Sequence, residues 1–107
     1  MTNFISTGST YWISDEEIQI FEKNATNGDK NSAFKLYQYH MFVSLDQDLE
    51  FKWLEIAAKN GHPIAQSNLA DLFFTQGNKE KAIFWAKKAY RNGAKLPDEL
   101  KILIDIN

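Results

Sequence analysis

The chain has 107 residues, of which 44% are hydrophobic and 14% aromatic, with five glycines, two prolines, no cysteine and a formal net charge of −2. This length predicts one domain, and the composition is too apolar for a disordered segment and too poor in turn residues for a many-turned β-sandwich. The lack of cysteine excludes disulfides, thiolate metal sites and cysteine nucleophiles. A helical globular domain fits best.

Charge is unevenly distributed along the sequence. Residues 1–60 hold nine Asp/Glu against five Lys, whereas residues 61–107 hold five Asp/Glu against seven Lys/Arg. We therefore expect a dipolar molecule. A net acidic chain also argues against general nucleic-acid binding, because phosphates are neutralised by a clustered basic face.

Residues 1–13 are expected to form an irregular amino-terminal arm. They contain no basic flank and no apolar run long enough for a signal peptide, and no stretch of the chain approaches the ~20 apolar residues of a membrane span. The sequence predicts a cytoplasmic protein that does not enter a membrane.

The first predicted helix begins after Ser14, which stands three residues before Glu17 in a capping-box pattern. It runs to about Asn27, where Gly28 can close it in the left-handed conformation. Gly61 and Gly93 follow asparagine in the same way and predict two similar helix ends.

Four further helices are expected near 30–43, 47–60, 63–75 and 79–92. Asp46 or Asp48 is the expected amino-terminal cap of the second of these, Asn78 is that of the last, and Gly77 lies in a tight turn. Connections of two to five residues make successive helices antiparallel neighbours.

The segment 96–106 is expected to be a carboxy-terminal cap helix. Pro97 suits a first helical turn, and Asp98 and Glu99 lie where the helix dipole favours acids. The β-branched residues near its end are also compatible with a strand, but no partner strand is expected elsewhere in the chain.

An internal repeat organises residues 14–93, with 94–107 left for the cap helix. One constant shift along the sequence superposes Trp53 on Trp85 and Ala57 on Ala89. The same shift also matches Ala33 with Ala65, Tyr37 with Leu69, Met41 with Phe73, Phe42 with Phe74, Phe51 with Ile83 and Asn60-Gly61 with Asn92-Gly93. Phe21 and Ala25 keep the tryptophan–alanine spacing in a third, partial copy. The period is that of a helix pair, and Trp53 and Trp85 are predicted core residues.

These residues resemble the Sel-one-like repeats (SLR), which are related to the tetratricopeptide repeats. Asp48–Gly61 and Lys79–Gly93 are similar to the second helix of such a repeat, and Gly61–Ala70 is similar to the first helix of the next. The likeness covers residues 28–93 well and 14–27 partially, although the inter-helix loops are shorter than is usual in the family. The resemblance implies a short right-handed α-solenoid of about three antiparallel helix pairs, whose relatives are chiefly adaptors, scaffolds and binding partners.

Catalytic and metal-binding signals are weak. His40 and His62 are the only histidines and have no ligand at metal-site spacing, so His40 is predicted to be a half-buried, hydrogen-bonded residue and His62 a helix-entry residue. The alternating acids Asp46, Asp48 and Glu50 lack the glycine of a calcium loop and are better explained by capping. No nucleophile or phosphate-binding motif is present. The sequence predicts no enzymatic activity, no cofactor and no metal.

The candidate binding surface lies on the first helix of each pair, which lines the concave side in this class of solenoid. Aromatic and amide groups suit a protein interface. The candidate protein-binding residues are Asn31, Phe34, Lys35, Gln38, Tyr39, Gln66, Asn68, Asp71 and Gln76. An alternative remains open, in which Phe34 and Tyr39 pack against the arm of residues 1–13.

Two functions are compatible with a protein-binding module. The first is a small immunity protein that neutralises a bacterial toxin, with the acidic half between Asp15 and Glu55 covering a basic active-site cleft. The second is a general SLR-type adaptor or scaffold in a larger complex. Two clear repeat copies, caps expected at both ends and no predicted linker favour a single partner and thus the first.

Overall fold

The computed structural model describes residues 10–105, and residues 1–9 and 106–107 lie outside the described part. Within it are six helices and no strand. The helices are α1 (Asp15–Thr26), α2 (Lys30–Phe42), α3 (Gln47–Lys59), α4 (Pro63–Thr75), α5 (Lys79–Arg91) and α6 (Asp98–Leu103). The all-helical prediction is confirmed. The last helix is helical as expected but shorter than the predicted 96–106, whose end at Ile106 falls outside the described residues.

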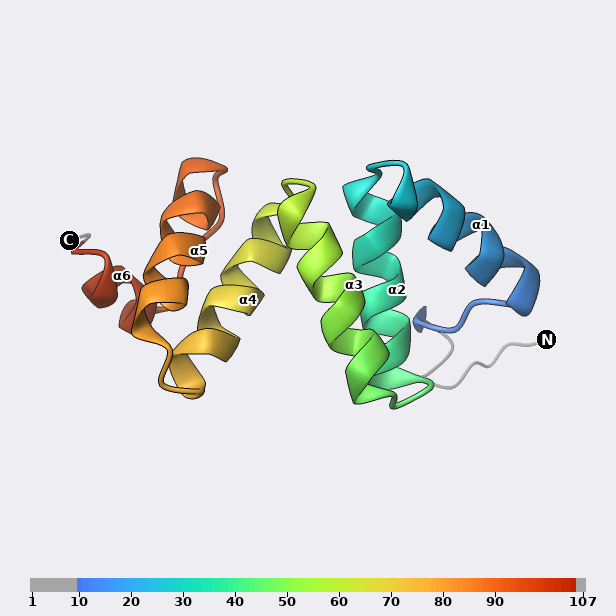
Figure 1. Ribbon diagram of the computed structural model, residues 1–107, viewed down its shortest axis with the longest axis horizontal. Helices are drawn as coiled ribbons and strands as arrows, with labels where there is room; N and C mark the ends of the chain where they lie inside the picture. Colours follow the sequence, from blue (N-terminus) through green and yellow to red (C-terminus); the bar gives the residue numbers. More distant parts are fainter. Residues whose placement is uncertain (1–9, 106–107) are drawn as a thin grey trace.

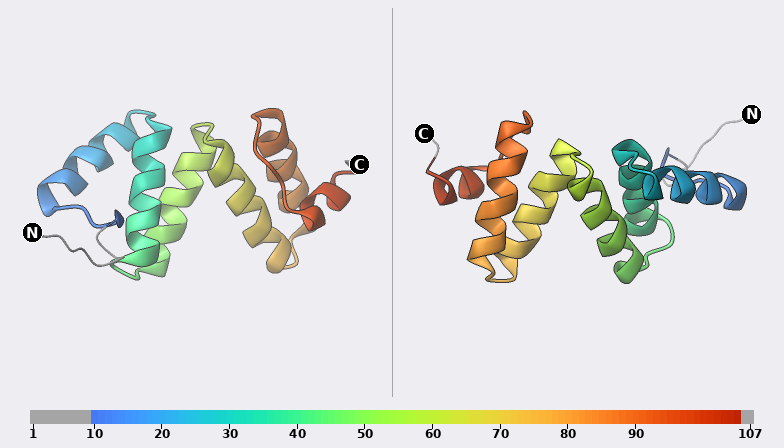
Figure 2. Two further views of the ribbon diagram at one scale, coloured as in Figure 1. Left: turned by 180° about the vertical axis from the view of Figure 1, so that it is seen from behind. Right: turned by 45° about the horizontal axis from the view of Figure 1, so that its top comes forward.

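The helices form a zigzag along an elongated molecule of 49 × 30 × 24 Å (Figure 1). α2 and α3 lie side by side as an antiparallel hairpin, and α4 and α5 form a second hairpin. α3 and α4 meet at their shared loop and diverge from it, as the different views in Figure 2 also show. α1 packs against α2 at one end, and α6 packs against α5 at the other. No helix within residues 10–105 combines the length and apolarity needed to cross a bilayer.

Side-chain caps fix where the helices begin. Ser14 accepts a hydrogen bond from the Glu17 amide while Glu17 accepts from the Ser14 amide, so the predicted capping box is present. Asp46 and Asn78 cap α3 and α5, and these two predictions are confirmed. His62 caps α4 through its ring nitrogen.

Glycine closes four of the helices with one motif. After α3, the Gly61 amide donates to the Ala58 carbonyl and the His62 amide donates to the Ala57 carbonyl, both at 3.0 Å, with Gly61 at φ +96°. Gly28, Gly77 and Gly93 also have positive φ. The Asn-Gly stops predicted from the sequence are therefore confirmed as real helix ends.

Leu45 has a left-handed backbone although it is not a glycine, with φ 58°. It directly precedes the cap of α3, and the corresponding residue before the cap of α5 is Gly77, with φ 82°. The Leu45 side chain is 72% exposed, so its packing is a minor contribution to stability. A left-handed backbone destabilises a residue that has a Cβ by about 1–2 kcal/mol, so glycine relieves strain at this position. Glycine also raises the conformational entropy of the unfolded chain, which offsets part of the stabilisation. We expect Leu45→Gly to raise the free energy of unfolding by about 0.5–1 kcal/mol in urea titration. Leu45→Ala, which keeps the Cβ, is the control and should give no comparable gain.

The repeat has two offsets, which corrects the single shift expected from the sequence. α3 and α5 begin at Gln47 and Lys79, in agreement with the shift that superposes Trp53 on Trp85. α2 and α4 begin at Lys30 and Pro63, which is one position further apart. The loop after α2 covers 43–46 and the loop after α4 covers only 76–78, which absorbs the difference. Ala33 therefore corresponds in position to Gln66, and not to Ala65.

The core lies between the helices as two connected clusters. Trp53 is 3% exposed and packs in the larger cluster with Leu54 and Ala57, whereas Trp85 is only half-buried and contacts both clusters. The prediction of Trp53 as a core residue is confirmed, and that of Trp85 is confirmed in part. Alanines in the contact faces allow the helices to approach closely, and the large side chains fill the space beside them.

Candidate protein-binding site

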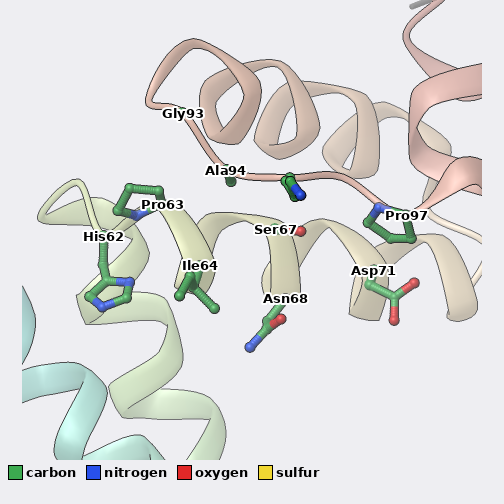
Figure 3. A pocket seen from close by; sticks show the side chains of 10 residues that line it. His62, Pro63, Ile64, Ser67, Asn68, Asp71, Gly93, Ala94 and Pro97 are labelled. Carbon is green, nitrogen blue, oxygen red and sulfur yellow. The ribbon is translucent and has the colours of Figure 1, made fainter.

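A hollow lies between the first half of α4 and the segment 93–97 that joins α5 to α6 (Figure 3). Its volume is about 590 Å³. We call it the α4 pocket, and it is lined by His62, Pro63, Ile64, Ser67, Asn68, Asp71, Gly93, Ala94, Lys95 and Pro97. Apolar and charged groups both reach this hollow, which is typical of a recognition site.

The periodicity of α4 explains why these side chains share the pocket. Ala65 and Leu69 face the core with no exposed surface, which directs Ile64, Asn68 and Asp71 to the other side of the helix. Ile64 remains 55% exposed. An exposed isoleucine next to an amide and a carboxylate gives the pocket an apolar contact with polar groups beside it.

His62 occupies the junction of α2, α3 and α4. Its Nδ1 accepts a hydrogen bond from the Ala65 amide at 3.2 Å, and its ring stacks on Phe34 of α2 with centroids 4.0 Å apart and planes 14° apart. Burial lowers the pKa of His62, and the nearby Lys30 ammonium lowers it further. The ring is therefore held in the neutral form that can accept from the α4 backbone.

A second hollow, the α3–α4 groove, opens where these two helices diverge. One part, of about 320 Å³, is lined by Tyr37, Glu50, Leu54, Asn68, Asp71, Leu72 and Thr75. A neighbouring part, of about 360 Å³, is lined by Gln47, Glu50, Phe51, Leu54, Leu72 and Gln76. Because Asn68 and Asp71 line both the groove and the α4 pocket, the two hollows form one tract along α4.

The groove is acidic. Glu50 and Asp71 are its two charged lining residues, and no lysine or arginine of the described chain lines either part. Asn68 donates a hydrogen bond to the Tyr37 hydroxyl at 3.3 Å. Burial raises the pKa of the Tyr37 phenol; the Asn68 hydrogen bond opposes this shift, and the Glu50 carboxylate adds to it.

The structure brings some of the predicted binding residues together. Asn68 and Asp71 lie in both hollows, and Gln76 lines the α3–α4 groove. Asn31 and Lys35 are exposed on α2, where Gln38 and Tyr39 are half-buried. With the longer of the two repeat offsets, Asn31, Lys35 and Gln38 stand at the positions of Ile64, Asn68 and Asp71 on α4.

Gln66 was expected on the binding surface, and this expectation is wrong. The residue is 3% exposed, its Nε2 donates to the Ala58 carbonyl at 3.0 Å, and its Oε1 accepts from Asn92 at 2.9 Å. A buried amide needs such partners, so the side chain is used inside the fold. It links the end of α3 to the end of α5. At the preceding junction Asn60 donates directly to the Ala25 carbonyl at 3.4 Å.

Phe34 contacts two aromatic side chains within the fold. Its aromatic neighbours are Tyr37 and His62, and it is half-buried between them. In the described part of the arm, Tyr11 stacks on Phe42 with centroids 4.4 Å apart. Residues 10–13 of the arm thus contact Phe42, and packing by residues 1–9 falls outside the described part of the chain.

Several pocket residues were not predicted as binding residues. The sequence predicts His62 only as a helix-entry residue and gives Pro63 and Ile64 no binding role, and Lys95 and Pro97 come from a segment distant in sequence. The longer repeat offset, applied to Asn31, would have pointed to Ile64. Nothing in the sequence indicated that 93–97 folds back over α4.

His40 has a structural role at the opposite end of the hairpin. It is 6% exposed, its Nδ1 lies 2.7 Å from the Ser44 hydroxyl oxygen, and burial lowers its pKa. Among residues 10–105 no group of three or more His, Cys, Asp or Glu side chains could hold a metal ion.

The fold and this tract define an all-helical protein with paired helices and a mixed apolar and acidic recess along one of them. The chain is similar to the uncharacterized protein YibG of Escherichia coli strain K12, with 33% identity over 95 residues, or 82% of this chain and 62% of YibG. The chain thus spans less than two-thirds of the length of that relative. No family model matches the chain, and no solved structure matches it.

Proposed function

We propose that this protein is a non-enzymatic protein-binding module built as a short right-handed α-solenoid of the Sel-one-like type. Two equivalent hairpins, α2–α3 and α4–α5, and three Asn-Gly helix ends support the repeat architecture. In such a solenoid neighbouring hairpins leave a recess between them. In this chain that recess is the α3–α4 groove, and the α4 pocket adjoins it along α4.

The observation that carries the proposal is the acidic α3–α4 groove. Glu50 and Asp71 stand beside Leu54 and Leu72 in a groove that no described cation lines. This combination suits a basic protein segment, since opposite charges speed encounter and apolar contacts slow dissociation. A bacterial toxin with a basic active-site cleft is a partner of this chemistry, and an immunity protein that binds it there excludes substrate without any chemistry of its own.

Charge reversal in the groove tests this proposal. In a pull-down from the native host followed by measured binding of the captured protein, Asp71→Lys should weaken the complex by about tenfold or more, because like charges then meet. Glu16→Lys is the matched control, an exposed charge reversal on α1 outside both hollows, and should leave the affinity nearly unchanged. Equal binding by both variants would place the interface elsewhere.

Co-expression with the captured protein then distinguishes an immunity protein from an adaptor. If the captured protein arrests growth alone and growth returns with this chain, the immunity function is supported. A captured protein that is harmless alone, or remains toxic with this chain present, would reject immunity and leave the adaptor function.

One observation favours the adaptor alternative, namely a second surface of opposite charge on α5. Phe84 is 53% exposed and lies on the outward face of α5. Four cations stand three, four or seven positions away on the same face, namely Lys81, Lys87, Lys88 and Arg91. The ion pairs within residues 10–105 are Glu55–Lys59 and Asp98–Lys101, so these four cations are not paired there. An adaptor would use two such surfaces at once, and Phe84→Ser would then release one partner while the α4 tract keeps the other.

A further inference from the structure

The cap of α4 differs chemically from the cap at the equivalent position of α2. Asp29 caps α2 by accepting from the Asn31 amide, and the hydroxyl of Ser32 donates to the same carboxylate at 2.7 Å. That hydrogen bond holds the pKa of Asp29 below its ordinary value, so this cap persists in weak acid. His62, which takes the place of Asp29 in the next hairpin, accepts with an imidazole nitrogen that is lost as an acceptor when the ring is protonated.

We propose that His62 is a proton-sensitive joint between the two hairpins, whose protonation releases the cap of α4 and reshapes the α4 pocket. The geometry supports this assignment because His62, Pro63 and Ile64 form both the entry of α4 and one wall of the pocket. When Nδ1 binds a proton it cannot accept from the Ala65 amide, and the first turn of α4 loses its side-chain cap.

The groups around the ring oppose its protonation on balance. From α2, Lys30 repels a cation, whereas the Phe34 face attracts one. From α4, the positive end of the helix dipole repels a cation at the cap position, and Asp71 lies further along the pocket wall. From the segment 93–97, Lys95 brings a second positive charge to the same pocket. Burial of the ring also disfavours its protonated form, as the two lysines do.

Residue-resolved NMR of the protein alone tests whether protonation of His62 releases the cap of α4. The His62 ring should titrate below its ordinary pKa of about 6.5. Over the same pH range, the exchange protection factor of the Ala65 amide should fall about five- to tenfold, in keeping with the loss of one helix cap. His40, the other histidine, should titrate without moving the Ala65 amide.

Two variants at position 62 make the test specific. In His62→Asn, which keeps a non-titrating cap, Ala65 protection should stay constant from pH 7.5 to 5. In His62→Asp, which copies the α2 cap, it should fall only when the carboxylate titrates. Constant protection in the wild type through the His62 titration would overturn the proposal, and so would an equal fall in His62→Asn.

Regulation of binding is the step that rests on the proposed function. With a partner captured through the α4 tract, the dissociation constant of the wild type should rise at least about threefold between pH 7.5 and a pH about one unit below the His62 titration midpoint found by NMR, and it should stay flat in His62→Asn. A flat wild-type profile would overturn the link to binding. Failure to capture any partner would count against the proposed function alone, because the NMR experiment shows independently whether protonation of His62 releases the cap of α4.

Discussion

Replacing Trp53 with alanine is expected to lower the free energy of unfolding by about 3–5 kcal/mol. The side chain is 3% exposed in the larger core cluster, where it packs with residues of neighbouring helices. Truncation removes a large buried apolar area and leaves a cavity that rigid helix contacts cannot close. Small domains have only about 5–15 kcal/mol of stability, so this loss is a large share of the total.

Two other tryptophan variants control this prediction in urea unfolding. Trp85→Ala should cost less, about 1–3 kcal/mol, since Trp85 is only half-buried. Trp53→Phe should cost about 1.5 kcal/mol or less, because the buried Nε1 of Trp53 has no hydrogen-bond partner among residues 10–105 and no such bond is lost. A loss under about 1 kcal/mol for Trp53→Ala would contradict the packing described above.

Gln66→Ala is expected to destabilise the protein by about 2–3 kcal/mol, the second-largest effect. The variant removes the donor to the Ala58 carbonyl and the acceptor for Asn92, and it leaves a cavity at a site that is 3% exposed. Because this amide joins the ends of α3 and α5, its loss affects the contact between two hairpins. Thermal and urea unfolding monitored by circular dichroism measure the change.

A double-mutant cycle isolates the pair. Asn92 is exposed, so Asn92→Ala alone should cost only about 0.5–1 kcal/mol, and the double variant should cost less than the sum of the single variants because they share one hydrogen bond. Strict additivity of the two losses would show that the Gln66–Asn92 contact contributes nothing.

Residue spacing alone predicted part of the candidate site correctly and part of it wrongly. Asn68 and Asp71 were predicted as binding residues from their place on α4, and both line the two hollows. Gln66 belonged to the same prediction but faces inward, because position 66 matches Ala33 and not a surface residue. The one-residue difference in loop length shifts the correspondence between α2 and α4 by one position, or about 100° of helix rotation, so Gln66 matches the buried Ala33 and not the half-buried Phe34.

The sequence by itself determined the local structure of this protein. Ser14, Asp46 and Asn78 set helix starts, and the Asn-Gly pairs set helix ends, because capping depends on hydrogen bonds and backbone angles within a few residues. The tertiary structure alone decided which groups far apart in sequence meet. The stacking of His62 on Phe34, and the approach of Lys95 and Pro97 to Asn68 and Asp71, depend on the angles between hairpins. Those angles follow from side-chain packing summed over whole helix faces, and periodicity within one helix carries no information about them.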